Sequence, residues 1–213
     1  MRIIIPTLIA ATMIPAISSA ETYSVDVWAD NWFEMRINGV QVAEDSVPIT
    51  TERSFNAESF TFEADAPFVI GVVAKDFKEN DTGLEYIGSR RQQMGDGGLI
   101  VQVKNSAGET VVVSDESWQC AVIHTAPLDK SCEKSDDPVA GEGVCLFEAA
   151  DEPQGWDHAD FDASDWPAAS VYSAAAVDPK MGYNDINWDD RAAFIWGPDL
   201  EQSNTVLCRV SVE

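Results

Sequence analysis

Short segments in which apolar and polar residues alternate recur along most of this chain, and this period of two restricts its fold more than any other feature. Alternation of this kind is typical of half-buried β-strands. We expect strands at residues 23–28, 33–37, 40–42, 55–62, 68–74, 99–103, 110–113, 118–123, 192–196 and 205–212. Asn38-Gly39 is the strongest short signal for a hairpin, and helical periodicity is confined to one turn at 158–166. The pattern predicts an all-β sandwich or jelly roll with long loops.

The N-terminus has the order of a secretory signal. Arg2 precedes an apolar run at residues 3–17, and Ser18-Ser19-Ala20 then supplies the small residues that a signal peptidase reads. The run is shorter than the roughly 20 residues of a membrane-spanning helix. We therefore expect residues 1–20 to be a signal peptide and residues 21–213 to form one domain without a membrane span. This mature domain would be periplasmic or secreted.

All the cysteines follow the expected cleavage site; they are Cys120, Cys132, Cys145 and Cys208. An even number behind an export signal indicates two disulfides. Four cysteines allow three connectivities. Local context favours Cys132–Cys145, closing a polar insertion at about 127–154, and Cys120–Cys208, joining two strands.

The charge of the chain is strongly negative. It has 13 Lys and Arg against 37 Asp and Glu, a formal net charge of −24. Such a field repels nucleic acid and anionic membrane surfaces, so neither is an expected partner. It favours cations and cationic partners, or serves solubility alone.

Three stretches resemble the galactose-binding-like, or lectin-like, sandwich found in the N-terminal domains of bacterial α-L-rhamnosidases. They are Trp28-Ala-Asp-Asn-Trp-Phe-Glu-Met-Arg-Ile-Asn-Gly39, Ser114-Asp-Glu-Ser-Trp118, and Gly155-Trp156 through Phe161-Asp162 to Asp165-Trp166-Pro-Ala168. Together with Ile195-Trp-Gly197 they cover most of residues 21–213 in the expected order. The resemblance implies a jelly-roll sandwich. It does not imply a chemistry, because one fold serves many functions.

Seven tryptophans suggest a carbohydrate site. Exposed indoles stack on the apolar faces of sugar rings, and the indole N–H needs a polar partner. Trp118, Trp166 and Trp196 stand at positions that the resemblance assigns to the core. Trp32 and Trp188 have Asn and Asp neighbours instead, and they are the expected platform. The polar groups beside them are Asn31, Asn184 and Asn187. The expected partner is a glycan or another small ligand of the cell envelope.

A second resemblance points to copper. Trp118 to Cys132 is similar to a segment of the exported copper-binding proteins of methane-oxidising bacteria, in which copper lies on two imidazoles and an oxidised tryptophan in a Trp-x-His arrangement. This chain has two histidines, His124 and His158, and its one Trp-x-His is Trp156-Asp157-His158. That triplet falls inside the stretch shared with sugar-binding sandwiches. The candidate metal ligands are therefore His124, His158, Trp156, Asp157 and Asp160.

Calcium is the other metal to consider, because it takes six to eight oxygen ligands from loops. Two acidic clusters could supply them. The first is Asp157, Asp160, Asp162 and Asp165, and the second is Asp185, Asp189 and Asp190. The resemblance gives Asp162 and Asp165 a different role, which is to hold a turn through side chain to backbone hydrogen bonds.

The chain lacks the motifs of common enzymes. It has no Gly-x-Ser-x-Gly elbow, phosphate loop or His-Glu-x-x-His helix, although a glycosidase needs only two carboxylates. Arg90-Arg91 is the one paired cationic spot after the signal peptide, suited to an anionic group or a local ion pair. We expect an exported, non-catalytic module that binds a carbohydrate or envelope ligand. The alternative is a metal-binding protein for copper or calcium.

Overall fold

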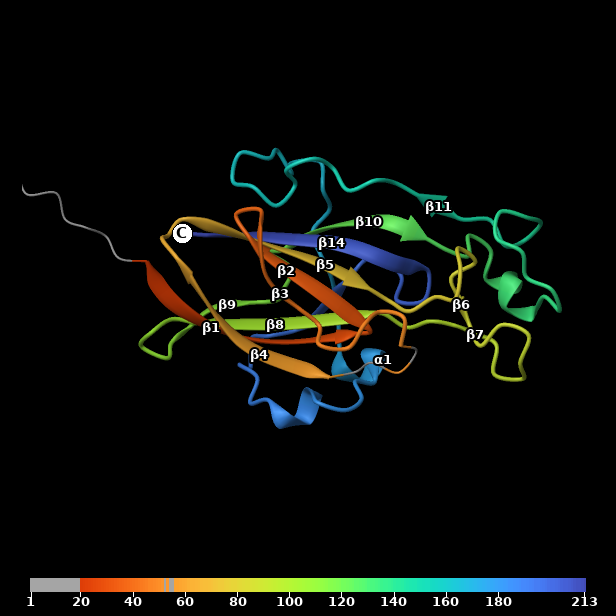
Figure 1. The fold of residues 1–213 in the computed structure, drawn as a ribbon, viewed down its shortest axis with the longest axis horizontal. Coiled ribbons are helices and arrows are strands. Elements are labelled where there is room, and N and C mark those ends of the chain that lie inside the picture. The colour runs from red at the N-terminus through yellow and green to blue at the C-terminus, as the bar shows by residue number, and fades with distance from the viewer. Residues whose placement is uncertain (1–19, 52, 54–55) are drawn as a thin grey trace, which may run out of the picture.

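Two antiparallel sheets packed face to face make an all-β sandwich (Figure 1). The structure is a computed structural model that describes residues 20–51, 53 and 56–213. Residues 1–19, which hold nearly all of the predicted signal peptide, lie outside the described residues, so that prediction stays a prediction. No helix within the described ranges is long and apolar enough to span a membrane.

Sheet A has the strand order β12-β13-β8-β1-β4, and β9 pairs with β8 off this path. Its strands are β1 (Glu21–Asp30), β4 (Ala57–Ala64), β8 (Gly98–Lys104), β9 (Thr110–Val113), β12 (Ser170–Tyr172) and β13 (Phe194–Trp196). Sheet B has the order β11-β10-β14-β5-β2-β3. Its strands are β2 (Trp32–Ile37), β3 (Val40–Glu44), β5 (Phe68–Lys75), β10 (Gln119–Thr125), β11 (Glu148–Ala149) and β14 (Ser203–Val212).

The core lies between the sheets and follows the alternation seen in the sequence. In β1, Val27 points into it, whereas its neighbour Trp28 points to the outer side of sheet A. Trp118 and Trp196 are fully buried in this core, as expected. Their indole N–H groups donate to main-chain carbonyls at 2.9 and 2.7 Å, respectively. These hydrogen bonds remove the cost of burying the indole N–H groups.

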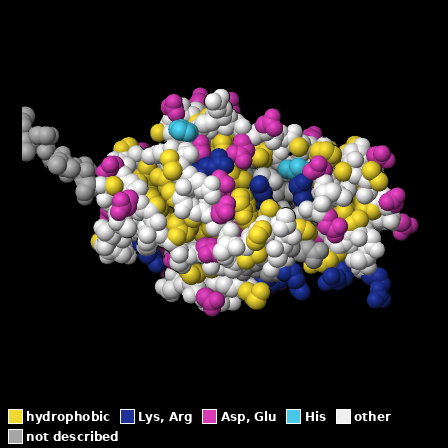
Figure 2. Space-filling model, in the orientation of Figure 1, with side chains coloured by type: hydrophobic (Ala, Val, Ile, Leu, Met, Phe, Trp, Pro, Cys, Tyr) yellow, Lys and Arg dark blue, Asp and Glu magenta, His cyan; other side chains and the backbone are white. Residues whose placement is uncertain are grey.

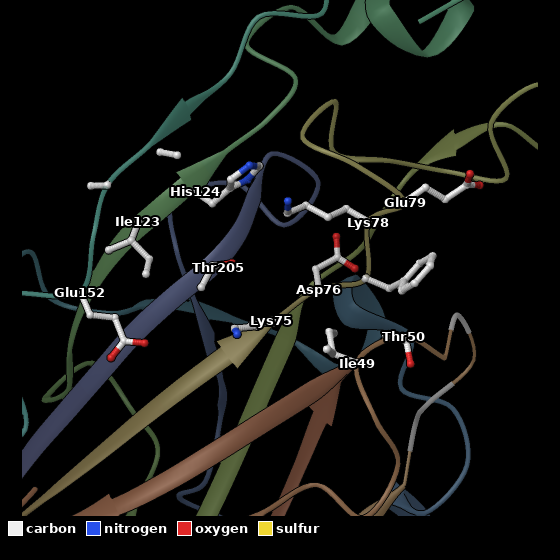
Figure 3. A pocket seen from close by; sticks show the side chains of 13 residues that line it. Ile49, Thr50, Lys75, Asp76, Lys78, Glu79, Ile123, His124, Glu152 and Thr205 are labelled. Atoms are coloured by element: carbon white, nitrogen blue, oxygen red, sulfur yellow. The ribbon is translucent and has the colours of Figure 1, made fainter. Parts of the chain in front are cut away.

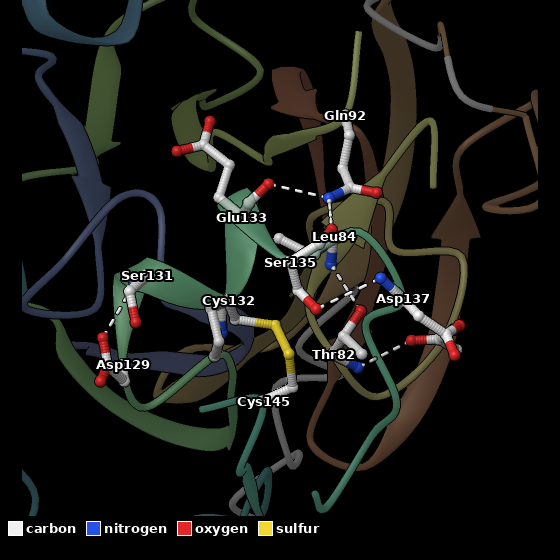
Figure 4. Close-up of a disulfide and its surroundings, with 12 residues drawn as sticks. Thr82, Leu84, Gln92, Asp129, Ser131, Cys132, Glu133, Ser135, Asp137 and Cys145 are labelled. Carbon is white, nitrogen blue, oxygen red and sulfur yellow. Dashed lines mark hydrogen bonds between the residues drawn. A yellow bond between two sulfur atoms is a disulfide. The ribbon is translucent and has the colours of Figure 1, made fainter. Parts of the chain in front are cut away.

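The two disulfides pair as local context favoured. Cys120–Cys208 joins neighbouring strands of sheet B, where the two residues are direct partners of β10 and β14. Cys132–Cys145 lies in the insertion, within a small lobe of its own (Figure 4). The lobe contains η1 (Lys130–Lys134) and the short hairpin of β6 (Leu84–Glu85) and β7 (Gln93–Met94). The Gln92 side chain donates to two carbonyls of the insertion at 2.8 Å each, which fixes the hairpin to it.

The prediction of a helical turn at 158–166 is wrong, because this segment is irregular. The helices of the described chain are η1, α1 (Ala174–Val177) and η2 (Tyr183–Asp185), all a turn or so long. Two irregular segments cover the outer faces of the sandwich instead. Residues 152–166 lie on sheet B, and residues 173–192 lie on sheet A, at the top and bottom of Figure 1, respectively.

Candidate functional site

A row of directly paired residues crosses the outer face of sheet B. Trp32 of β2 pairs with Lys75 of β5, Lys75 pairs with Thr205 of β14, and Thr205 pairs with His124 of β10. Side chains directly opposite in antiparallel strands lie on the same face. Their neighbours in each strand, such as Phe33 and Val206, point into the core. With about 4.8 Å between strands, the four residues extend over roughly 14 Å.

One half of this outer face is covered by residues 152–166. Trp156 packs on Gly71 of β5, where an added Cβ would lie 3.1 Å from the indole ring. Two arginines of the sheet hold the segment down. Arg36 forms ion pairs with Glu152 at 3.0 Å and Asp157 at 3.4 Å, and Arg209 donates to the His158 carbonyl at 3.0 Å. The covering segment is therefore part of the fold, and the rest of the face stays open.

The open half forms a groove of about 710 Å³ (Figures 2 and 3). Its floor includes Lys75, Thr205, Ile123 and His124 of sheet B. Its walls come from the strand ends and loops that surround them, namely Ile49, Thr50, Asp76, Phe77, Lys78, Glu79, Ala149, Ala150 and Glu152. The lining combines apolar and polar groups, as small-molecule sites do.

Two lysines bring positive charge to the groove. Lys78 pairs with Asp81 at 2.5 Å. Lys75 lies over the ring of Trp32, with 4.9 Å from Nζ to the ring centroid, a distance typical of a cation–π contact. Figure 3 shows the Lys75 side chain between β5 and β14, facing the open space.

His124 is buried in the floor of the groove, and both of its ring nitrogens have partners. Nδ1 lies 3.0 Å from Asn204 Oδ1, and Nε2 lies 3.1 Å from Asp81 Oδ1. Burial, followed by the positive charge of Lys78, lowers the pKa of His124, although the contacts with Asn204 and Asp81 raise it. The ring also stacks on Phe147 at 5.7 Å. At neutral pH the imidazole is therefore uncharged, and the positive charge of the groove comes from its lysines.

The structure separates the residues predicted to form a sugar site. Trp32 lies beside the groove on sheet B, whereas Trp188 stacks on Tyr183 on the outer side of sheet A. Asn184 and Asn187 are exposed in the same covering segment as Trp188. Asn31 is 2% exposed, and its side-chain oxygen accepts the Phe77 N–H at 2.5 Å. The prediction that Asn31 binds ligand conflicts with this burial, because its amide supports the backbone instead.

The two histidines also lie apart. The ring of His158 lies against Gly39, in the turn between β2 and β3. His124 lies in the row that begins at Trp32, at the other end of β2. At about 3.3 Å per residue, these positions are roughly 20 Å apart along the strand, and Figure 2 shows the two histidines well separated. Two imidazoles at this distance do not share one metal ion.

The other predicted metal ligands have structural contacts. Trp156 is 1% exposed and donates to Glu152 at 3.2 Å, and Asp157 pairs with Arg36. Asp160 is exposed. In the second acidic cluster, Asp189 holds Arg191 through two hydrogen bonds of 2.8 Å. Asp162 accepts the Ser164 N–H at 3.0 Å, which is the turn-holding role that the resemblance implied. Within the described ranges, no three His, Cys, Asp or Glu side chains form a ready-made metal site.

A pair of buried carboxylates went unnoticed in the sequence. Asp30, at the end of β1, is 1% exposed, and Asp76, just after β5, is 2% exposed. None of their four carboxylate oxygens has a hydrogen-bond partner among the described residues. Burial first, then the charges of Asp96 and Glu85, raise the pKa of Asp30 to about 9.

Asp76 is in the same electrostatic situation. Burial, followed by repulsion from Asp30 and Glu85, raises its pKa well above the usual value. Asn204 has the smallest effect on the pKa of Asp76, which it lowers, but the positions of the atoms give its Nδ2 no hydrogen-bond partner. The loop before β8 passes directly over this carboxylate, because a Cβ on Gly95 would lie 2.0 Å from Oδ2. The sequence signal for this buried carboxyl group was an Asp shortly after the apolar run at 68–74, and such a signal is weak.

Arg90 and Arg91 lie at the tip of the lobe. Both are exposed, and the Arg91 guanidinium lies 4.1 Å from the ring centroid of Tyr86. No ion pair of either arginine occurs within residues 20–51, 53 and 56–213. The local carboxylate partner expected from the sequence is therefore not found there.

Comparisons with protein-family models, with curated proteins and with solved structures found no match for this chain. The geometry of the groove and of the buried carboxylates is accordingly the basis for assigning a function.

Proposed function

We propose that this chain is an exported, non-catalytic module that binds a carbohydrate in the groove on the outer face of sheet B. The observation that carries the proposal is the groove over Lys75, Thr205 and His124, with Trp32 against Lys75 at its edge, on a sheet whose other half is covered. An indole edge, an ammonium and a hydroxyl in one line suit a sugar, which presents an apolar ring face and a rim of hydroxyls. Two disulfides support export, because such bonds persist in oxidising compartments.

The carboxylates of the groove support binding without catalysis. Glu152 accepts from Arg36 and from the Trp156 indole N–H, and the oxygens of Asp76 are inaccessible. A glycosidase needs one carboxyl group to protonate the leaving oxygen and a second to act as base or nucleophile. Glu79, the third carboxylate of the lining, lies on the exposed rim and accepts the Ile87 N–H at 2.7 Å. We therefore expect none of the three to fill such a role.

Glycan-array binding, followed by affinity electrophoresis in gels of the retained polysaccharides, tests this proposal. Trp32→Ala should weaken binding by about tenfold or more, since stacking and hydrogen bonding of one aromatic contribute on the order of 1–2 kcal/mol. Trp188→Ala is the matched control on the opposite face, and it should leave retention unchanged. Thermal melts of both variants establish that they are folded. Absence of any retained glycan, or loss of retention in Trp188→Ala alone, contradicts the proposal.

A second candidate function is calcium binding, and the unpartnered carboxylates of Asp30 and Asp76 favour it. Ionising two buried carboxyl groups that lack donors and repel each other is costly. A hard dication removes both the repulsion and the lack of partners, and carbonyls and waters complete its six to eight oxygens. Glu85, which accepts from Gln93 at 2.9 Å, adds negative charge nearby. The donor set suits calcium and offers copper no nitrogen or sulfur ligand.

Thermal melts in calcium and in EDTA test this candidate. A ligand that binds only the folded state at 100 times its Kd stabilises by about 2.7 kcal/mol, which corresponds to roughly 5–10 °C in Tm for a domain of this size. The double variant Asp30→Asn/Asp76→Asn should lose this response. The matched control is Asp160→Asn/Asp165→Asn, at two exposed positions of the covering segment. A response that disappears in the control and persists in the buried variant contradicts the assignment.

A further inference from the structure

The groove contains a lysine, Lys75, that forms no ion pair with any residue that the structure describes. Ion pairs in the described residues involve Lys78, Lys104, Lys130 and Lys180, but neither Lys75 nor Lys134. Of these two lysines, Lys75 is the one that lines the groove. Within residues 20–51, 53 and 56–213, the ammonium of Lys75 contacts the ring of Trp32, with 4.9 Å from Nζ to the ring centroid.

Apart from the buried carboxyl group of Asp76, the other charged groups around the groove have partners inside the protein. Lys78 and His124 both contact Asp81, at 2.5 and 3.1 Å. Glu152 is held by Arg36 at 3.0 Å. Glu79 accepts the Ile87 N–H at 2.7 Å on the exposed rim. Among the described residues, Lys75 is therefore the charged group without an ionic partner that a ligand meets on the floor of the groove, and its charge is positive.

The negative electrostatic field of the whole molecule makes the positive charge of Lys75 selective for where an anionic ligand binds. A net charge of −24 repels anions from most of the surface, so an acidic ligand is favoured only where a cation is available. Lys75 is half-buried between paired strands, and Thr205 is its direct cross-strand partner. An ammonium in partly desolvated surroundings binds an anionic group more strongly than one in free solution.

We propose that the ligand of the groove is an acidic polysaccharide, whose carboxylate or sulfate group binds Lys75 Nζ while a sugar ring packs on Trp32. This inference rests on the carbohydrate function proposed above and names its ligand class. In the free protein the ammonium covers the indole face. When it moves to the anionic group, the face that it leaves is available to the sugar ring. Binding of the anionic group by Lys75 and stacking of the sugar ring on Trp32 are therefore coupled.

Matched polysaccharides test the proposal by affinity electrophoresis and titration calorimetry. Polygalacturonate and its fully methyl-esterified form differ in the carboxylate, and dextran sulfate and dextran differ in the sulfate. The wild-type protein should bind one acidic member at least tenfold more tightly than its neutral counterpart, and raising the salt concentration should weaken that binding. The pair that responds identifies whether the anionic group is a carboxylate or a sulfate.

Lys75→Met keeps the length and apolar character of the side chain but removes its charge. It should reduce affinity for the acidic polymer by about tenfold, as expected for one charge-assisted contact of about 1.4 kcal/mol. Lys104→Met is the control for net charge, because Lys104 lies on sheet A and pairs with Asp26 at 3.8 Å. It should bind as the wild type does.

The outcomes separate the two proposals. If neutral and acidic polymers bind equally, or if Lys75→Met binds the acidic polymer as tightly as the wild type, the acidic ligand is refuted and the carbohydrate function stands. If Lys104→Met loses as much affinity as Lys75→Met, net charge rather than Lys75 is responsible, and the proposal is also refuted. If no polymer of either kind binds, and the wider array is negative too, the carbohydrate function itself fails.

Discussion

Raising the pH in the absence of divalent cations should destabilise this protein through Asp30 and Asp76. Burial raises the pKa of Asp30 from its usual 3.8 to about 9, and it raises that of Asp76 in the same direction. Between these values the folded state holds a proton that the unfolded chain has released. The free energy of unfolding therefore falls as the pH rises through this window, by about 1.4 kcal/mol per pH unit for one group.

The expected size follows from the same numbers. For Asp30 alone, the interval from pH 5 to pH 8 corresponds to about 4 kcal/mol, and the whole window sets an upper limit of about 7 kcal/mol. A loss of 4 kcal/mol is a large part of the 5–15 kcal/mol of a typical domain. It corresponds to a fall in Tm of roughly 8–16 °C for a chain of this length.

Thermal melts at pH 5, 6, 7 and 8 in EDTA, and again in calcium, measure the effect. In EDTA the Tm should fall steeply with pH. In saturating calcium the decline should be much smaller, because the bound ion stabilises the ionised carboxylates. Asp30→Asn/Asp76→Asn should lose the calcium response and show a much shallower pH dependence, to which Asp45 and Asp96 still contribute because burial raises their pKa values too. If this variant retains the slope of the wild type, other groups cause the slope and the reasoning is wrong.

Three further predictions concern the scaffold. Reduction or Ala substitution of the Cys132–Cys145 disulfide should lower the free energy of unfolding by about 3 kcal/mol, from the loop-entropy relation for a separation of 13 residues. Urea unfolding measures this loss, and an unchanged midpoint would contradict the prediction. Gly71→Val should destabilise the folded state by about 1–3 kcal/mol and expose Trp156, because the added side chain meets the indole ring. A tryptophan fluorescence spectrum without a red shift would refute this packing argument. Arg209→Met removes hydrogen bonds to the carbonyls of residues 152–166 and should therefore increase cleavage within this segment in limited proteolysis. An unaltered cleavage pattern would show that other contacts hold the segment in place.

Sequence reasoning located most strands, because a period of two is a local property. It placed β1, β5, β8 and β14 to within two residues of their observed ends. The Asn38-Gly39 turn has positive φ at both residues, 48° and 81°, as the hairpin signal requires. The short strands β6, β7, β11 and β12 were missed, since two or three residues carry no measurable period.

The candidate site was predicted only in part. Trp32 was predicted to bind the ligand, and it lies beside the groove, against Lys75. Its expected partners Asn184, Asn187 and Trp188 lie on the other sheet. Alternation tells which side of its own strand a residue occupies. It does not tell which outer face remains open, because that depends on where the covering segments pack.

The sequence by itself determined an all-β chain with hairpins at defined places and an even set of cysteines. The tertiary structure decided which distant residues meet. Asp30 and Asp76 interact because the ends of β1 and β5 converge, where the Asn31 N–H donates to the Lys75 carbonyl at 2.8 Å. His124 and His158 are separated because sheet B places them at opposite ends of its strands. Strand pairing joins residues that are far apart in the sequence. The packed sandwich therefore determines which of these groups lie close together, and no local sequence pattern predicts it.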